Sequence, residues 1–183
     1  FTADRFTVIH GLQEKNDDAN RTHIGEYGWY EVYLRNGKEG LKRYLGSNDE
    51  IGFDEVEKIV REFKAGSDEI SLKRMGRKDT ELWYEKVDFS GVQVLVIEWR
   101  HGNSDNYRGV DIPVLLNSTP RETLAHRRAR KRDGATDSLF TMMVLEIEQE
   151  MLEQQASKAK IIISKRGELL SYGAYCRQME EGR

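Results

Sequence analysis

Apolar residues recur at spacings of three and four in two long stretches of the chain, which predicts two amphipathic helices. Residues 53–65 form the first helix, and its apolar positions are Phe53, Val56, Ile59, Val60 and Phe63. Gly66 follows where a left-handed C-terminal cap is expected. The second helix spans about residues 138–156, and its buried side is marked by Phe140, Val144, Ile147, Met151 and Leu152.

A third helix is predicted from its start signal. Thr119 takes the N-cap position, Pro120 lies in the first turn, and Glu122 follows the threonine by three residues, which is the pattern of a capping box. This helix should run to about Arg132. A terminal helix is expected after the turn at Gly167.

Other stretches predict strands. Residues 92–99 (VQVLVIEW) are nearly filled with branched apolar side chains, which is typical of a parallel strand covered on both faces. Residues 110–116 and 160–164 predict further buried strands, although Pro113 removes one ladder donor from the first of them. Shorter strands are predicted at Phe6–Ile9, Ile70–Leu72 and Leu82–Val87.

The order of these elements indicates an α/β fold with a mostly parallel sheet flanked by helices. In such folds ligands bind beyond the carboxyl ends of the strands, which directs attention to Glu98 and to Asn117–Thr119. The aromatic-rich segment Tyr27–Leu34 fits either a half-buried strand or a short helix.

Composition narrows the class of protein. The chain has 183 residues, a length that suits a single domain over residues 1–183. Its formal net charge of −3 disfavours a nucleic-acid surface across the whole domain. The one cysteine, Cys176, rules out an internal disulfide and favours a reducing, cytoplasmic compartment. No apolar run approaches the roughly 18 residues that span a bilayer, so we expect no membrane segment.

Basic residues are concentrated in His126–Arg132, where five of seven residues are Arg or Lys. Arginine suits phosphate because its planar guanidinium donates paired hydrogen bonds and stays ionised. A solvated helix surface whose cations complement the helix macrodipole explains the run equally well. A nucleic-acid patch is the weaker alternative, because the rest of the chain is acidic.

Two further features carry chemistry. Glu98 ends the strand at 92–99, and a carboxylate there can hold Mg²⁺ near a phosphate, although an ion pair with Arg100 is the plainer alternative. The aromatic residues around Trp29 can either stack on a nucleobase or pack in the core. The four histidines show no metal-ligand spacing, so we expect no zinc site.

From about Asn48 to Gly167, the order of these features resembles the uridine kinase and phosphoribulokinase-like branch of the P-loop kinases. Residues 1–46 match that family poorly, and residues 120–137 correspond to its arginine-rich lid. The matching segments are Asn48–Asp54, Val87–Ser90, Val94–Trp99, Asp111–Leu116, Thr119–Leu124, Arg127–Asp133 and Ala159–Ser164.

The resemblance implies transfer of the γ-phosphoryl group of ATP, with Mg²⁺, to a hydroxyl of a nucleoside- or sugar-like metabolite. Glu98 would help hold the metal, and the lid would close over the phosphates and stabilise their charge. The catalytic residues it implies are Asp4, Arg127, Arg128 and Arg132, and the cofactor-binding residues are Arg130 and Asp133.

The chain departs from that family because no GxxxxGK[ST] phosphate loop is present. Since residue 1 is Phe rather than Met, we expect that loop upstream of Phe1, and a degenerate, non-catalytic relative is one alternative. The main alternative is a phosphate- or nucleic-acid-binding module that uses the basic helix at 121–132. The sequence leaves open the phosphoryl acceptor and whether the protein forms a homo-oligomer.

Overall fold

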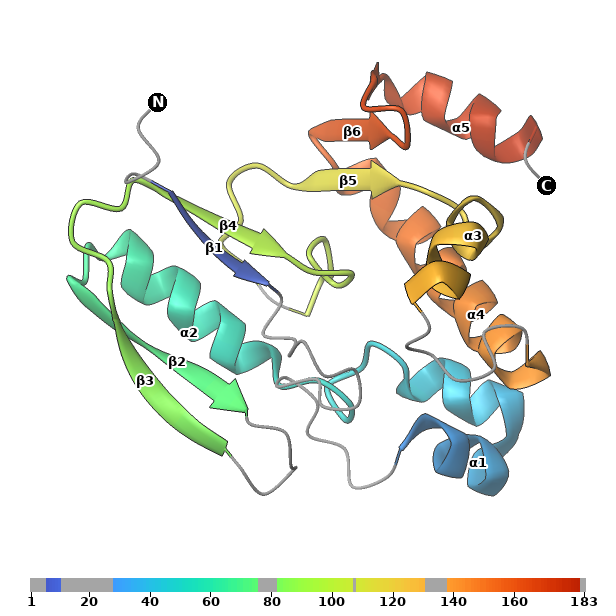
Figure 1. Ribbon diagram of the computed structural model, residues 1–183, viewed down its shortest axis with the longest axis horizontal. Helices are drawn as coiled ribbons and strands as arrows, with labels where there is room; N and C mark the ends of the chain where they lie inside the picture. The colour runs from blue at the N-terminus through green and yellow to red at the C-terminus, as the bar shows by residue number, and fades with distance from the viewer. Residues whose placement is uncertain (1–5, 11–27, 76–81, 107, 131–137, 182–183) are drawn as a thin grey trace. The chain divides into compact units, whose positions relative to one another are not determined.

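The computed structural model describes residues 6–10, 28–75, 82–106, 108–130 and 138–181 (Figure 1). The chain divides into two compact units, Phe1–Val110 and Asp111–Arg183, and each is described by itself. The architecture is mixed α/β, because both units combine helices with small sheets. The prediction that residues 1–183 form one kinase-like domain stays a prediction.

The described residues of unit 1 form two helices and two small sheets. Its elements are β1 (Phe6–His10), α1 (Trp29–Tyr44), α2 (Phe53–Lys64), β2 (Glu69–Met75), β3 (Leu82–Asp88) and β4 (Val94–Glu98). Strands β1 and β4 pair in parallel, and β2 and β3 pair antiparallel. The segment around Tyr27–Leu34, which the sequence left open, is helical from Trp29 onward. Gly37 interrupts α1 with a φ of 67°, a left-handed conformation that glycine adopts without strain.

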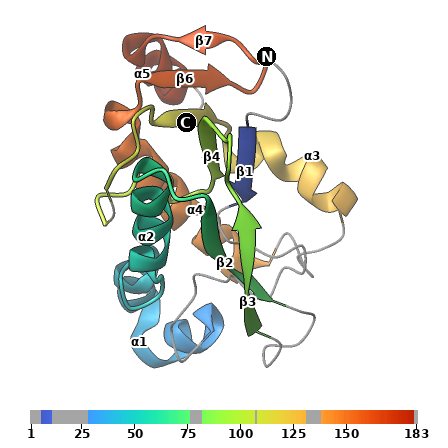
Figure 2. The same ribbon diagram turned by 90° about the vertical axis from the view of Figure 1, so that its left-hand side faces the viewer.

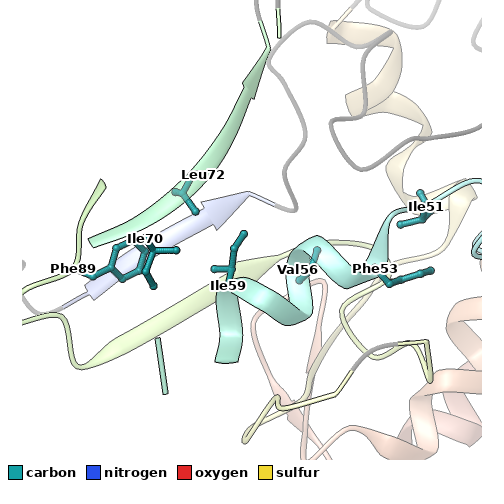
Figure 3. Close-up of a cluster of buried hydrophobic side chains, with 7 residues drawn as sticks. All are labelled: Ile51, Phe53, Val56, Ile59, Ile70, Leu72 and Phe89. Carbon is teal, nitrogen blue, oxygen red and sulfur yellow. The ribbon is translucent and has the colours of Figure 1, made fainter. Parts of the chain in front are cut away.

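Helix α2 provides the centre of the core of unit 1, as its apolar spacing predicts. It packs against β2, and its inward side chains meet residues of β2 and the turn after β3 (Figure 3). The buried cluster consists of Ile51, Phe53, Val56, Ile59, Ile70, Leu72 and Phe89. Leu95 and Ile97 of β4 are half-buried against this cluster, so α2 is covered by residues of both sheets.

Unit 2 is built around a three-stranded sheet. Its elements are β5 (Val114–Asn117), α3 (Pro120–Arg130), α4 (Leu139–Gln155), a single 3-10 turn (Ala156–Lys158), β6 (Ile161–Ser164), β7 (Leu169–Leu170) and α5 (Tyr172–Glu181). Strand β6 lies between β5, its parallel neighbour (Figure 1), and β7, its antiparallel neighbour (Figure 2). A separate core joins Leu115, Ala156, Ile162, Tyr175 and Met179.

The helix starts and ends follow the local signals in the sequence. Thr119 forms the predicted capping box, in which its Oγ1 accepts from the Glu122 backbone N–H at 3.2 Å and its own N–H donates to the Glu122 carboxylate at 2.8 Å. Ser138 caps α4 by accepting from the Thr141 N–H at 3.0 Å. Gly66 has a φ of 75°, as expected for a left-handed cap.

The expectation of a mostly parallel sheet is corrected by the structure. Among the described strands, two pairings are parallel and two are antiparallel, and they form three small sheets. Strands β2 and β3 are close in sequence and pair antiparallel, as short connections require. The turn at Gly167, with a φ of 82°, returns the chain so that β7 pairs with β6 in the opposite direction.

The predicted burial of the apolar strands on both faces is also wrong. Val94 and Val96 of β4 are each 40% exposed, and Leu116 of β5 is 65% exposed, whereas Leu115 is buried. Strand β5 begins at Val114 because Pro113 has no N–H for the ladder. The Pro113 carbonyl instead accepts from the Lys160 N–H at 2.9 Å.

No helix in the described ranges is both long enough and apolar enough to cross a bilayer. The predicted cytoplasmic location stays a prediction.

Candidate functional site

The carboxyl end of β4 is the place where the sequence predicts a ligand site. Glu98 is the last residue of this strand and is exposed, and His10 is its register partner on β1. The parallel pair therefore places Glu98 at a strand end, where ligands bind in α/β folds. Within the described ranges, no three His, Cys, Asp or Glu residues gather to hold a metal ion, so the magnesium role of Glu98 stays a prediction.

Glu50 is a buried carboxylate with two strong donors. Its side chain is 0% exposed, and it lies in the connection between α1 and α2. Trp29 Nε1 donates to Glu50 Oε1 at 2.5 Å, and the Gly46 backbone N–H donates to Glu50 Oε2 at 2.5 Å. These bonds compensate part of the cost of burying the carboxylate, which is large for an unpaired charge. They also join the start of α1 to its end.

Burial and hydrogen bonding act on the Glu50 carboxyl in opposite directions. Burial raises its pKa, because the low-polarity interior disfavours the charged form. The Gly46 N–H, the positive charge of Arg100 and the Trp29 N–H each lower it, but the net pKa is above the usual value. Glu50 therefore holds a proton more readily than an exposed glutamate.

Arg100 lies next to this carboxylate, two residues after β4 ends. Its guanidinium carbon is 4.8 Å from the centre of the Trp29 ring, a cation–π arrangement. Its Nε donates to His101 Nε2 at 3.2 Å. We name Trp29, Glu50, Arg100 and His101 the Glu50 cluster. Its members come from the start of α1, the connection before α2, and the loop after β4.

His101 is the neutral member of the Glu50 cluster. It is 3% exposed, and its ring lies edge-on to Trp99 at 5.1 Å and to Phe53 at 6.1 Å. Burial, with a smaller effect from the Arg100 charge, lowers the His101 pKa to about 3. The imidazole is therefore neutral at pH 7, and because Nε2 accepts from Arg100, the ring proton belongs on Nδ1.

The loop after β4 is fastened to the rest of unit 1 at its far end as well. Asn106 Nδ2 donates to the Gly46 carbonyl at 3.0 Å, and Gly46 is the residue whose N–H binds Glu50. Within the loop, the Gly102 N–H donates to the Trp99 carbonyl at 3.0 Å and the Ser104 N–H donates to the His101 carbonyl at 2.9 Å. Arg100 is thus presented on a loop with a fixed local conformation.

The predicted lid residues fall in unit 2 or outside the described residues. Arg127 of α3 is buried at 7% exposure, whereas Arg128 is exposed. Arg130 is the last residue of α3. Asp4, Arg132 and Asp133 lie outside the described residues. The basic run therefore contains at least two kinds of arginine, one buried and one exposed.

Sequence reasoning missed two central members of the Glu50 cluster. Glu50 belongs to the polar segment Ser47–Glu50, and no periodicity marks it as buried. His101 was considered only as a metal ligand. Trp29, which the sequence left open between stacking on a nucleobase and packing in the core, is half-buried, and its indole N–H is bonded to Glu50. Trp29 and Glu50 are 21 positions apart in the sequence, so no local signal marks this bond.

Comparison with known proteins gives one informative similarity. No family model matches the chain. Over 158 residues, or 86% of its length, the chain is 42% identical to a protein of Mediterraneibacter gnavus named bifunctional alpha-galactosidase/sucrose kinase AgaSK. The chain spans 16% of the length of that protein. One of the two activities in that name is a kinase activity, which is the class of reaction that the sequence predicts.

Proposed function

We propose that this chain is part of a sugar kinase that transfers the γ-phosphoryl group of ATP to a hydroxyl of sucrose or a similar sugar. The observation that carries the proposal is the 42% identity to a protein with sucrose kinase in its name. The independent resemblance of residues 48–167 to P-loop kinases supports the same reaction class and a P-loop kinase-like fold. The sugar acceptor replaces the broader nucleoside- or sugar-like acceptor that the sequence alone left open.

The reaction forms a bond between the sugar hydroxyl oxygen and the γ-phosphorus of ATP. The bond from that phosphorus to the β,γ-bridging oxygen breaks, ADP leaves, and the hydroxyl proton passes to a base. Enzymes accelerate this step mainly by positioning the groups and stabilising the phosphoryl charge. The chemistry therefore calls for cations near the phosphates and a carboxylate near the hydroxyl.

The sequence offers residues for both tasks. In this proposal Glu98 helps hold Mg²⁺, and Asp4 is the base. The transferred phosphoryl group is stabilised by Arg127, Arg128 and Arg132. Arg130 and Asp133 contact the nucleotide. The exposed position of Arg128 on α3 suits contact with a ligand, whereas Arg127 is buried.

The test is a coupled assay of the whole protein with ATP, Mg²⁺ and either sucrose or uridine, with products identified by mass spectrometry. We expect a sugar phosphate and ADP with sucrose, and no uridine phosphate. Arg128→Ala should lower kcat by about tenfold to a thousandfold, since transition-state charge stabilisation is of this size. The matched control is Arg177→Ala, an exposed arginine of α5 in the same unit, which should leave kcat unchanged.

A binding module without catalysis is the second candidate, because Arg121 and Arg128 are both exposed on the basic helix α3. Absence of any phosphorylated sugar, together with RNA or DNA binding that weakens steeply with salt, would favour it over the kinase. A salt-insensitive or undetectable nucleic-acid affinity would remove it.

A further inference from the structure

The Glu50 cluster contains Arg100, which lies just beyond the end of β4. The proposed function assigns roles to the arginines of α3 and none to Arg100. We propose that Arg100 is a polyphosphate-binding residue, and that Glu50 and Trp29 are positioning residues that hold its guanidinium at the end of β4. This inference deepens the proposed function, because the polyphosphate of a nucleotide is the anion that it assigns to Arg100.

The Arg100 side chain is held on two sides. The Trp29 ring lies 4.8 Å from the guanidinium carbon, and His101 Nε2 accepts from Nε at 3.2 Å. Preorganisation of this kind lowers the entropy lost when an anion binds.

Glu50 fixes the Trp29 ring on which the Arg100 guanidinium stacks. Its carboxylate binds the Trp29 indole N–H on one oxygen and the Gly46 N–H on the other. Trp29 therefore cannot rotate away from Arg100 without breaking a buried hydrogen bond to a carboxylate. Such a bond is costly to break, because it leaves a buried polar group unsatisfied.

Arg100 and the residues around it differ in charge and in exposure to solvent. His101 is neutral at pH 7 and adds no positive charge beside Arg100, so the arginine supplies the cation of the Glu50 cluster. Glu50 is fully buried and Arg100 is partly exposed. An anion approaching from solvent thus meets the guanidinium before the carboxylate.

The position of Arg100 in the chain is just beyond the carboxyl end of β4. Arg100 follows Glu98 by two residues, at the carboxyl end of a strand in a parallel pair. Ligands of α/β folds bind beyond this edge. Arginine favours planar recognition of phosphate oxygens, so a polyphosphate suits this place better than a neutral sugar.

The test is titration of the whole protein with inorganic tripolyphosphate, followed by calorimetry at fixed ionic strength without sugar or ATP. We expect Arg100→Ala to weaken tripolyphosphate binding by about tenfold to a hundredfold, which is the usual loss of a charged hydrogen bond. The tripolyphosphate affinity of Arg100→Lys should lie between those of Arg100→Ala and the unchanged protein. Lysine keeps the positive charge but lacks the planar guanidinium that donates paired hydrogen bonds and stacks on Trp29. The matched control is Arg35→Ala, which removes an equal charge from an exposed pair with Glu31 on α1.

Glu50→Gln tests the positioning role separately. It removes a negative charge near Arg100, so a simple charge effect would tighten tripolyphosphate binding. Glutamine has one acceptor oxygen in place of two, so either the Trp29 bond or the Gly46 bond is lost, and the looser anchoring of Trp29 should weaken binding. We expect weaker binding, and no further loss when Glu50→Gln is added to Arg100→Ala, because the two residues act through one contact. A merely structural role of Glu50 would give additive losses in the double variant.

Equal affinity of Arg100→Ala and the unchanged protein, with both folded by circular dichroism, would overturn the inference. Should Arg100→Ala fail to fold, Arg100→Lys decides the matter by the same criterion. Tighter binding by Glu50→Gln would overturn the positioning role alone. Arg100-dependent tripolyphosphate binding without sugar phosphorylation would leave this inference standing while the proposed kinase function fails.

Discussion

Two buried ionisable side chains meet at Arg100, and their protonation responds to folding in opposite directions. The pKa of His101 is lowered from 6.5 to about 3, so between these values the unfolded chain binds more protons at this residue than the folded chain. Glu50 has a raised pKa, so its contribution favours the folded state at low pH and is lost as the pH rises. Acid stability of unit 1 therefore depends on both residues.

We predict that His101→Gln reduces the acid sensitivity of the fold. In the unchanged protein, His101 should remove about 1.4 kcal/mol of stability for each pH unit below 6.5, because the buried imidazole resists protonation. Glutamine takes up no proton, so the variant should lose less stability between pH 6.5 and pH 4. Urea denaturation at a series of pH values measures the slope.

The control for this prediction is His126→Gln, which alters an exposed histidine of α3. It should change the slope of stability against pH less than His101→Gln does, because this side chain is exposed. Equal slopes for His101→Gln and the unchanged protein would show that the buried imidazole does not govern acid unfolding.

At the residue scale, sequence patterns predict core positions better than polar clusters. The spacing of Val56 and Ile59 identified them as buried, because one helix face repeats locally. Glu50 and His101 are equally buried, but what buries them is contact with residues distant in sequence. A single chain carries no local signal for such contacts, so the Glu50 cluster required the structure.

Among the elements, α2 ends at a glycine whose conformation makes a specific prediction. Gly66 has a φ of 75°, its N–H donates to the Phe63 carbonyl at 3.0 Å, and a β-carbon added there would meet nothing within 4 Å. Gly66→Ala should therefore lower the free energy of unfolding by about 1 kcal/mol through backbone strain alone. Thermal or urea unfolding measures the loss.

Gly173→Ala provides the comparison for Gly66→Ala. Gly173 lies in α5 without a left-handed φ, and a β-carbon added there would meet only Arg177 Nη1, at an ordinary 3.7 Å. Its replacement should not lower stability, because alanine favours a helix more than glycine does. Similar losses at the two glycines would contradict the explanation by left-handed strain.

Helix α3 depends on its capping box more than on apolar burial, because its sequence is dominated by charged residues. Thr119→Ala removes the acceptor for the Glu122 N–H and should cost about 1 kcal/mol of stability. Thr119→Ser keeps the hydroxyl and should restore most of it. Hydrogen exchange of the α3 amides measures both variants, and equal exchange in Ala and Ser variants would show that the cap does not stabilise the helix.

The elements that sequence patterns misjudged share one physical cause. Apolar runs such as Val94–Ile97 were expected to be covered on both faces, yet alternate residues of β4 are exposed. The pattern records that a side chain is apolar, whereas burial depends on what packs above the strand. Strand β7 has only two residues, and its pairing arises from the Gly167 turn rather than from any strand pattern of its own.

At the scale of the whole molecule, each unit has its own buried cluster, and the two clusters have no residue in common. Local patterns predicted the helices on which both clusters rest, but they could not divide the chain at Val110, because a division depends on the distribution of long-range contacts. Ile59 and Ile162 are equivalent probes of the two cores, since each is 3% exposed.

We predict that Ile59→Val and Ile162→Val each destabilise mainly the unit that contains the change. Loss of one buried methyl group typically costs 0.5–1.5 kcal/mol, roughly, and this is small enough to leave the protein folded. Hydrogen exchange should accelerate in α2 and β2 for Ile59→Val, and in β5, β6 and α5 for Ile162→Val, because exchange reports local opening of separate cores. Acceleration of the same amides by both variants would mean that the chain opens as one cooperative domain, which is the organisation expected from the sequence. Confinement to one unit would place the arginines of α3 and the Glu50 cluster on separately stabilised parts of the proposed kinase.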